Sequence, residues 1–181
     1  MDPSFHPSRE QLNSLLSVST LLTSSIDLPS LLKLIVTSVT ELLGCEASSL
    51  FLVDQTGEQL VLTIATGPVS SEIKEFRLSM GEGIVGWVGQ HRKSLIVNDA
   101  QHDSRFAESV DKMTGFKTRS ILAVPLMDHD QLVGVLETLN TAKTKRFEEA
   151  DLELLTAFGA YAAVALRNAE LVTSMRVKVN G

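Results

Sequence analysis

Two pairs of strand-like segments, each joined by a short turn, place the strongest constraint on how this chain can fold. The first pair is "EASSLFLVD" and "EQLVLTIAT", which flank "QTG"; the second is "RSILAVPLM" and "QLVGVLETLN", which flank "DHD". Apolar and β-branched runs on either side of a short polar turn are typical of β-hairpins. Because the strands of a hairpin pair antiparallel, the sequence predicts an antiparallel sheet.

Helical patterns lie at the two ends of the chain. Residues 28–43 carry apolar side chains with a period of 3.6, after start signals at Asp27 and Pro29 and before a stop at Gly44. The other predicted elements are a helix over 9–24, strands over 74–78 and 94–99, and a long helix over 148–176. Helices gathered at the ends of an antiparallel sheet indicate the α+β class.

The composition limits the cellular setting and the partners. At 181 residues, 44% of them apolar, the chain is long enough for one domain with a buried core. The net charge of −6 gives no long-range attraction to nucleic acid or to an anionic membrane. We find no signal-peptide pattern and no apolar run long enough to span a bilayer, and the single Cys45 excludes an intrachain disulfide. We therefore expect a cytoplasmic protein that binds neither nucleic acid nor membrane.

The glycines of "GEGIVGWVGQ" spell G-x-G-x-x-G, the pattern of a dinucleotide-binding loop. The preceding strand is half polar, and the helix that follows Gly83 is soon ended by "HRKS". The next strand begins too early for the crossover that a parallel unit needs. We therefore predict that these glycines permit a tight strand-to-helix turn and close packing of a short helix. The irregular segment over 100–117 is predicted to form a flap beside it.

Four motifs in this order resemble the GAF family, the small-molecule-sensing domains of signalling proteins. They are "GEGIVGWV", "VNDAQHDSRF", "KTRSILAVPL" and "LVGVLETLN". The resemblance implies a sheet of about six strands, with the terminal helices on one face and a pocket under the short helix and flap on the other. It implies a domain over 9–172, between a flexible arm at 1–8 and the start of a linker or signalling helix at 173–181.

The resemblance extends to the pockets of cyclic-nucleotide-binding GAF domains, whose stretch D-x-x-T-G-F-x-T is similar to "DKMTGFKT" here. The residues expected to contact a ligand are Ser49, Ile84, Val85, Asp111, Thr114, Thr118, Arg119 and Glu137. Asp111 and the two threonines are equally consistent with surface turns, and Arg119 with a solvated side chain. Glu137 lies on an otherwise apolar strand, where an inward-facing carboxylate needs a partner.

Base recognition departs from the family pattern. The family's aromatic-acidic pair, which reads the purine, falls at Ala65 and Thr66. A cyclic nucleotide is therefore not the expected ligand; a different small metabolite, or a nucleotide bound in another way, is. Bilin-binding members carry a cysteine near the flap and the family's sulfoxide reductase uses several, so the single Cys45 implies neither a bilin nor that activity. We also see no catalytic constellation and no metal-spaced cluster among the four histidines.

The last helix carries two apolar stripes. Leu155, Phe158, Ala162, Ala165, Ala169 and Val172 form one; Leu154, Tyr161, Val164 and Leu171 form the other. One stripe can cover the sheet, and the second then needs either the first helix of the same chain or a second copy. We predict a non-catalytic, homodimeric sensor of bacterial-type signalling that relays its ligand state to an output domain. The alternative is a ligand-free interaction module whose pocket has collapsed.

Overall fold

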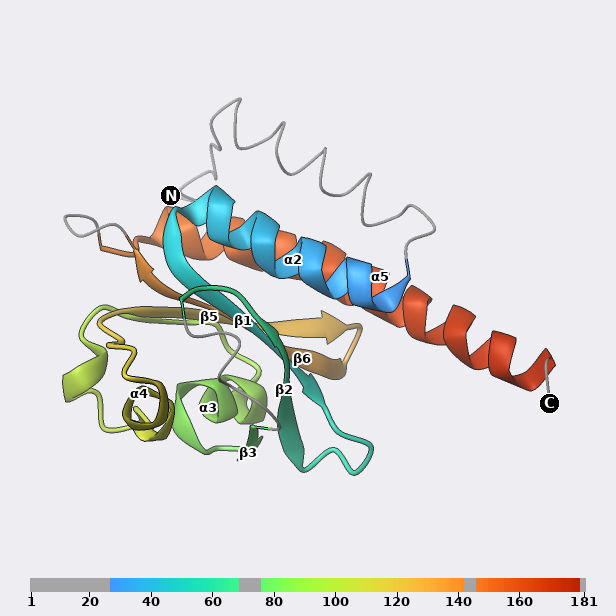
Figure 1. The fold of residues 1–181 in the computed structure, drawn as a ribbon, viewed down its shortest axis with the longest axis horizontal. Helices are drawn as coiled ribbons and strands as arrows, with labels where there is room; N and C mark the ends of the chain where they lie inside the picture. The colour runs from blue at the N-terminus through green and yellow to red at the C-terminus, as the bar shows by residue number, and fades with distance from the viewer. Residues whose placement is uncertain (1–26, 69–75, 142–145, 180–181) are drawn as a thin grey trace.

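The computed structural model describes residues 27–68, 76–141 and 146–179 (Figure 1). Its elements are α2 (Leu28–Leu43), β1 (Cys45–Val53), β2 (Gln59–Ala65), β3 (Arg77–Ser79), α3 (Gly83–His91), β4 (Leu95–Val97), the 3₁₀ turn η1 (Ala100–His102), α4 (Ser109–Thr114), β5 (Ile121–Asp128), β6 (Gln131–Thr141) and α5 (Glu149–Val179). The predicted arm over 1–8 and helix over 9–24 lie outside the described residues. No helix in the described ranges has both the length and the apolar character needed to cross a membrane.

The six strands form one antiparallel sheet in the order β3-β2-β1-β6-β5-β4. Both predicted hairpins are present, as β1–β2 and β5–β6, and the central pairing joins β1 to β6. The α+β class and the antiparallel sheet predicted from the sequence are confirmed.

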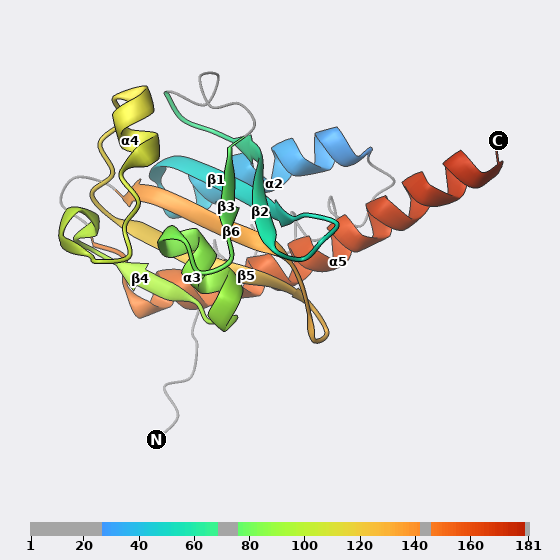
Figure 2. The same ribbon diagram turned by 90° about the horizontal axis from the view of Figure 1, so that it is seen from below.

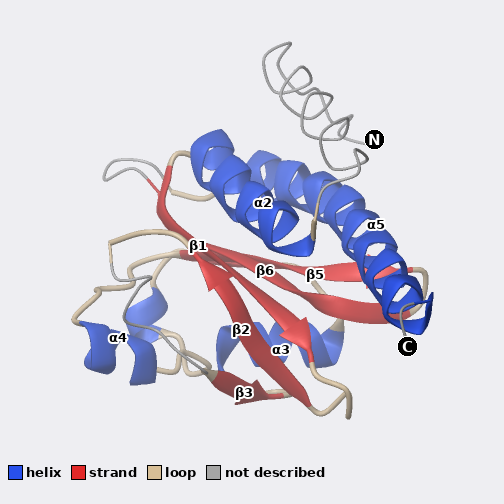
Figure 3. Cartoon of the chain, turned by 45° about the vertical axis from the view of Figure 1, so that its right-hand side comes forward, coloured by secondary structure: helices blue, strands red, loops and turns tan. Residues whose placement is uncertain are grey.

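Helices α2 and α5 cover one face of the sheet, as Figures 1 and 3 show. The Asp27 side chain caps α2 by accepting a hydrogen bond from the Ser30 amide at 3.1 Å, and Gly44 ends the helix at φ 61°. The buried side of α2 packs with α5 and with the even-numbered residues of β1, β5 and β6. The largest fully buried side chains of this layer include Leu31, Ile35, Leu50, Leu122, Leu136, Leu155 and Phe158.

The opposite face of the sheet lies beneath α3 and the segment that contains α4 (Figure 2). A second apolar core lies there, built from Phe51, Leu60, Leu78, Ile84, Val85, Val88, Ile121 and Val135. The odd-numbered residues Phe51, Ile121 and Val135 are the contributions of β1, β5 and β6 to this core, so each of these strands contributes to a core on both faces.

The glycine motif makes the predicted tight turn between β3 and α3. Gly81 and Gly83 have φ values of 88° and 69°, a region that glycine occupies without strain. A Cβ on Gly86 would lie 2.6 Å from the Ser79 carbonyl oxygen, so α3 approaches the backbone of β3 too closely for any larger residue. The following strand pairs antiparallel, not through a parallel crossover, and the prediction that the glycines serve packing is confirmed.

The segment over 100–117 differs in detail from the irregular flap predicted for it. It contains the turn η1 and the six-residue helix α4, which ends at Gly115 with φ 72°. One and a half turns of helix are too short to leave a readable apolar period in the sequence, which explains the difference.

Candidate functional site

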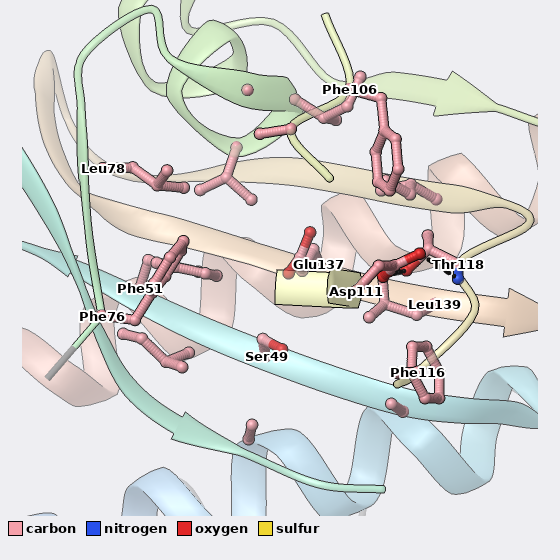
Figure 4. A pocket seen from close by; sticks show the side chains of 18 of the residues that line it. Ser49, Phe51, Phe76, Leu78, Phe106, Asp111, Phe116, Thr118, Glu137 and Leu139 are labelled. Carbon is pink, nitrogen blue, oxygen red and sulfur yellow. Dashed lines mark hydrogen bonds between the residues drawn. The ribbon is translucent and has the colours of Figure 1, made fainter. Parts of the chain in front are cut away.

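A cavity lies between the second face of the sheet, α3 and the flap, where the sequence predicted a pocket (Figure 4). Its volume is about 780 Å³ when the opening to solvent is included. Its lining is Ala47, Ser49, Phe51, Leu62, Ala65, Thr66, Phe76, Leu78, Gly83, Ile84, Val85, Phe106, Ala107, Asp111, Phe116, Thr118, Ile121, Glu137 and Leu139. An apolar lining with a few polar groups is typical of small-molecule sites.

The floor of the cavity is set by the register of three central strands. Glu137 on β6 pairs directly with Ser49 on β1 and with Ala123 on β5, and Ser49 pairs in turn with Ala65 on β2. Side chains directly opposite one another on neighbouring strands lie on the same face of a sheet. Glu137 and Ser49 therefore meet at the centre of the floor, with an alanine on either side of them.

Glu137 is the most perturbed ionisable group of the site. Its side chain is only 8% exposed, and the Ser49 hydroxyl donates a hydrogen bond to its carboxyl group. Burial, with a smaller contribution from the charge of Asp111, raises the pKa of Glu137 from 4.5 to about 7. The hydrogen bond from Ser49 acts in the opposite direction but is outweighed. Near neutral pH this carboxyl group exists in both protonation states.

Asp111 fastens the flap to the sheet. Its carboxylate accepts hydrogen bonds from the Thr118 backbone amide at 2.8 Å and from the Thr118 hydroxyl at 2.7 Å. The Gln101 side chain donates to the same carboxylate at 3.3 Å and to the Thr118 carbonyl at 2.7 Å. Asp111 and Thr118 line the cavity as predicted, and in this structure they bond to one another (Figure 4). Ligand contact by these two residues stays a prediction.

Two further predicted residues, Ile84 and Val85, line the cavity from the first turn of α3. Thr114 ends α4, and its side chain lies outside the described part of the structure. Arg119 does not line the cavity: it is exposed, and its guanidinium donates to the Glu46 carboxylate at 2.6 Å. The structure thus brings six of the eight predicted residues to the cavity wall and places Arg119 outside it.

Arg105, which lies within the flap, is also engaged outside the cavity lining. Its guanidinium pairs with Asp103 at 2.7 Å and lies over the Trp87 ring, 5.0 Å from the ring centre. Trp87 stacks in turn on His91 with 4.4 Å between ring centres. This cluster packs beside the cavity and contributes no side chain to its lining.

Sequence reasoning missed the aromatic wall of the cavity. Phe51, Phe76, Phe106 and Phe116 reach it from β1, the approach to β3, and the two ends of the flap. The alternation of β1 could have identified Phe51, because it lies two residues beyond Ser49 on the same face. The flap phenylalanines carry no periodic signal.

Thr66 has a role that its position in the sequence did not indicate. It lines the cavity, and its hydroxyl lies 2.8 Å from the hydroxyl of Thr40 on α2. It also accepts a hydrogen bond from the Ser48 amide at 2.9 Å, while the Thr40 hydroxyl lies 2.7 Å from the Val36 carbonyl. A short hydrogen-bonded path therefore connects the cavity with the helical layer.

Asn140, near the end of β6, fixes the end of the flap. Its side-chain oxygen accepts from the Arg119 amide at 2.6 Å, and its side-chain nitrogen donates to the Lys117 carbonyl at 2.8 Å. Asn140 adopts a left-handed φ of 54°, which asparagine tolerates better than most residues. Its function is to hold the strand that follows the flap.

The described residues contain no group of three or more histidine, cysteine or acidic side chains that could hold a metal ion. The His102 and Asp99 side chains lie 2.9 Å apart, and both are largely exposed to solvent. This pair lies in a polar turn and does not line the cavity.

Comparisons with known proteins agree with this architecture. A family model described as the GAF domain matches residues 27–166. The dual 3',5'-cyclic-AMP and -GMP phosphodiesterase 11A of Takifugu rubripes is 30% identical in an alignment of 165 positions that covers 86% of this chain. This chain spans only 18% of the length of that protein.

Solved structures share the fold. The GAF domain of a phosphoenolpyruvate-protein phosphotransferase from Coxiella burnetii superimposes with a TM-score of 0.80 at 23% identity, over 91% of this chain and 96% of that one. A free methionine-R-sulfoxide reductase from Neisseria meningitidis, in complex with its substrate, gives a TM-score of 0.72 at 19% identity, over 93% and 97% of the two chains. The family model accounts for most of the chain, the solved structures carry the same sheet and helices, and the chain therefore belongs to the GAF domain family.

Proposed function

We propose that this domain binds a small molecule in the cavity between the sheet and the flap and relays its occupancy to the terminal helices. GAF domains are regulatory sensory domains of signalling proteins. The observation that carries the proposal is the pair Glu137 and Ser49 on the floor of a largely apolar cavity. Burying a carboxyl group costs stability, and the fold gains nothing evident from it, whereas a bound molecule gains a specific anchor.

The ligand-free interaction module is the alternative. It requires a cavity filled by the protein's own side chains, yet Ala65 and Ala47 leave space there. The small side chains on this part of the wall favour the sensor.

A route from the cavity to the helices supports the relay. Thr66 belongs to the cavity lining and is bonded to Thr40 in the last turn of α2. In one consistent assignment the Thr66 hydroxyl donates to Thr40, and the Thr40 hydroxyl donates to the Val36 carbonyl. A ligand that displaces Thr66 would change the contact on which the end of α2 rests. Such a ligand shifts the helices only by its difference in affinity for the two arrangements.

The exposed side of α5 supports dimerisation with a second copy. The first apolar stripe of this helix is buried on the sheet, with Phe158 and Leu155 fully covered. Of the second stripe, Leu154 is buried in the core, whereas Tyr161, Val164 and Leu171 face solvent and are 53%, 50% and 53% exposed. The most exposed residues of α5 between 156 and 171 are uncharged: Thr156, Ala160, Tyr161, Val164, Asn168 and Leu171. The half-exposed Arg167 and Glu170 lie beside them and pair with one another at 3.5 Å.

The spacing of this face indicates a helical partner. Tyr161, Val164, Asn168 and Leu171 follow one another at intervals of 3, 4 and 3, the repeat of a coiled-coil seam with one polar position. A second copy would bring the same seam, and the helix predicted over 9–24 would complete a bundle. We propose that α5, which continues to Val179, passes the signal to an output domain in the same or a partner chain.

The phosphodiesterase relative is named for cyclic AMP and cyclic GMP, so cyclic nucleotides are included in the ligand screen. Positions 65 and 66, where we expected base recognition, hold an alanine and a threonine that bonds to Thr40. We therefore propose a different small molecule. The role proposed is regulatory and not catalytic. Since one structure of this fold is an enzyme, the screen should include assays for turnover of any compound that binds.

The test is the melting temperature of the chain against 3',5'-cyclic nucleotides, 2-oxoglutarate, amino acids and biogenic amines. A ligand at 100 times its Kd stabilises the native state by about 2.7 kcal/mol, which corresponds to roughly 5–10 °C for a domain of this size. Ala65→Phe, which fills the cavity, should abolish the rise while its own unliganded melt stays cooperative. A ligand that stabilises both proteins equally would place binding elsewhere and refute the proposed site.

A further inference from the structure

An asparagine joins the end of β4 to the start of α5, and the two elements lie beside one another in Figure 2. The Asn98 side chain, one residue beyond β4, donates to the Phe147 carbonyl at 3.0 Å and accepts from the Phe147 amide at 2.9 Å. Both polar atoms of this side chain are thus bonded to the backbone of one residue, 49 positions away in the sequence. Because hydrogen bonds are directional, two of them to one residue fix the orientation of the segments as well as their distance.

The α5 side of this contact is held firmly. Phe147 is 3% exposed and belongs to the core between the helices and the sheet. The amide of Glu148, the residue before α5, donates to the Asp151 carboxylate at 2.9 Å, and the Asp151 and Leu152 amides donate to the Glu148 carbonyl at 3.0 and 3.2 Å. The bond to Asp151 is one half of a capping box, which ties the first turn of a helix to the residue before it. A shift of Phe147 is therefore carried into the first turn of α5.

The flap side of the contact leads to the cavity wall. Ala100, two residues after Asn98, is fully buried, and its amide donates to the Arg119 carbonyl at 2.9 Å, which joins the two ends of the flap. The next side chain, Gln101, donates to the Asp111 carboxylate at 3.3 Å. Asp111 lines the cavity, so a short stretch of backbone connects Asn98 with a residue that a ligand would meet.

The contact between β4 and α5 depends on the chemistry of asparagine. An amide side chain has both a donor and an acceptor, so it can satisfy the N–H and the C=O of one residue at the same time. Aspartate in place of Asn98 would keep the bond from the Phe147 amide but would set a carboxylate oxygen against the Phe147 carbonyl. Alanine would remove both bonds.

We infer that Asn98 couples the flap to α5: a ligand that moves the flap shifts Asn98, and Asn98 shifts the start of α5 through Phe147. The inference rests on the proposed function, because it names the route by which the cavity acts on the helix that extends beyond the sheet (Figure 1). Rigid helices can carry such a displacement along their length. This route is distinct from the one through Thr66 and Thr40, which leads to α2.

The test uses a loosened flap as the input and therefore needs no ligand. Asp111→Ala removes the carboxylate to which Gln101 and Thr118 donate, and it should speed amide hydrogen exchange both in the flap and over residues 151–155 of α5. In an Asn98→Ala background the flap should respond as before, whereas the acceleration over 151–155 should be smaller by at least about twofold. The amides of 151–155 bond to carbonyls at the start of α5 and not to Asn98, so Asn98→Ala does not expose them directly.

Two further variants make the test specific. Ser94→Ala is the matched control, because the Ser94 hydroxyl lies 3.4 Å from the Thr156 hydroxyl and is another contact between the β4 edge and α5. It should leave the acceleration over 151–155 unchanged. Asn98→Asp should reduce the acceleration as Asn98→Ala does, and it replaces that variant if Asn98→Ala does not unfold cooperatively.

The outcomes separate this inference from the proposed function. An acceleration over 151–155 that is equal with and without Asn98 would overturn the inference, and so would an equal reduction in Ser94→Ala. A loosened flap with no change in α5 would overturn it too, as would a flap that Asp111→Ala does not loosen, since the route begins at that carboxylate. All of these results leave ligand binding untouched. A ligand screen in which nothing stabilises the protein would instead refute the sensor and leave the coupling between flap and α5 in place.

Discussion

Replacing Glu137 by glutamine tests whether the carboxyl group on the cavity floor is buried at a cost in stability. Glutamine keeps the size of the side chain and can accept from Ser49, but it cannot ionise. The pKa of Glu137 is raised from 4.5 to about 7, so the folded protein retains a proton that the unfolded chain releases. One pKa unit corresponds to about 1.4 kcal/mol, and the whole difference to about 3 kcal/mol.

The sign follows from linkage. Because the pKa is higher in the folded state, the stabilisation from this group is fully present below pH 4.5 and is lost as the pH rises through 7. The wild type should therefore lose about 3 kcal/mol relative to Glu137→Gln between pH 4.5 and pH 8. At pH 8 the variant should be the more stable protein by about that amount, or roughly 6–12 °C in melting temperature.

The assay is urea unfolding of both proteins at half-unit steps of pH, with the difference in unfolding free energy plotted against pH. All other titrating groups are common to the two proteins and cancel in the difference. Glu41→Gln, the same change on the exposed side of α2, serves as the matched control. If the curve for Glu137→Gln runs parallel to the wild type, Glu137 is not buried as a protonated acid and the reasoning about the cavity floor is wrong.

Three other changes follow from single contacts. Gly86→Ala should cost about 1–3 kcal/mol, because its Cβ would lie 2.6 Å from the Ser79 carbonyl oxygen; a melting curve unchanged from the wild type would contradict this packing. Asp111→Ala removes both bonds to Thr118 and should speed amide exchange over residues 100–117, while lowering the pKa of Glu137; unchanged exchange would show that another contact holds the flap. Val164→Glu places a charge on the exposed seam of α5 and should shift the protein toward monomer in sedimentation velocity; a wild type that is itself monomeric at high concentration would refute the dimer.

Local signals explain why much of the fold could be predicted from the sequence. Asp27 and Gly44 bound α2 by contacts within a few residues, and the two hairpins need only their own turns and flanking strands. The helix α4 and the partner of Thr66 could not be predicted. The first is too short to show a period, and the second depends on how α2 docks on the sheet.

The position of the candidate site was predicted from the sequence, but the direction and the partners of its charged side chains were not. Alternation could not decide where Glu137 points, because β6 is buried on both faces over residues 133–138. The direction became clear only from the register that places Glu137 opposite Ser49. For Arg119, the fit of a guanidinium to an anionic group suggested a ligand contact, but its partner Glu46 is 73 residues away in the sequence and becomes a neighbour only in the folded sheet.

Amide hydrogen exchange, with and without the compound that gives the largest increase in melting temperature, tests most directly the claim that the cavity senses a ligand and signals to the helices. The account predicts slower exchange in the flap over 100–117 and a change at the end of α2 around Thr40, with the change in α2 lost in Thr66→Val. Altered exchange confined to segments that do not line the cavity, or a flap and α2 unchanged at saturation, would contradict it.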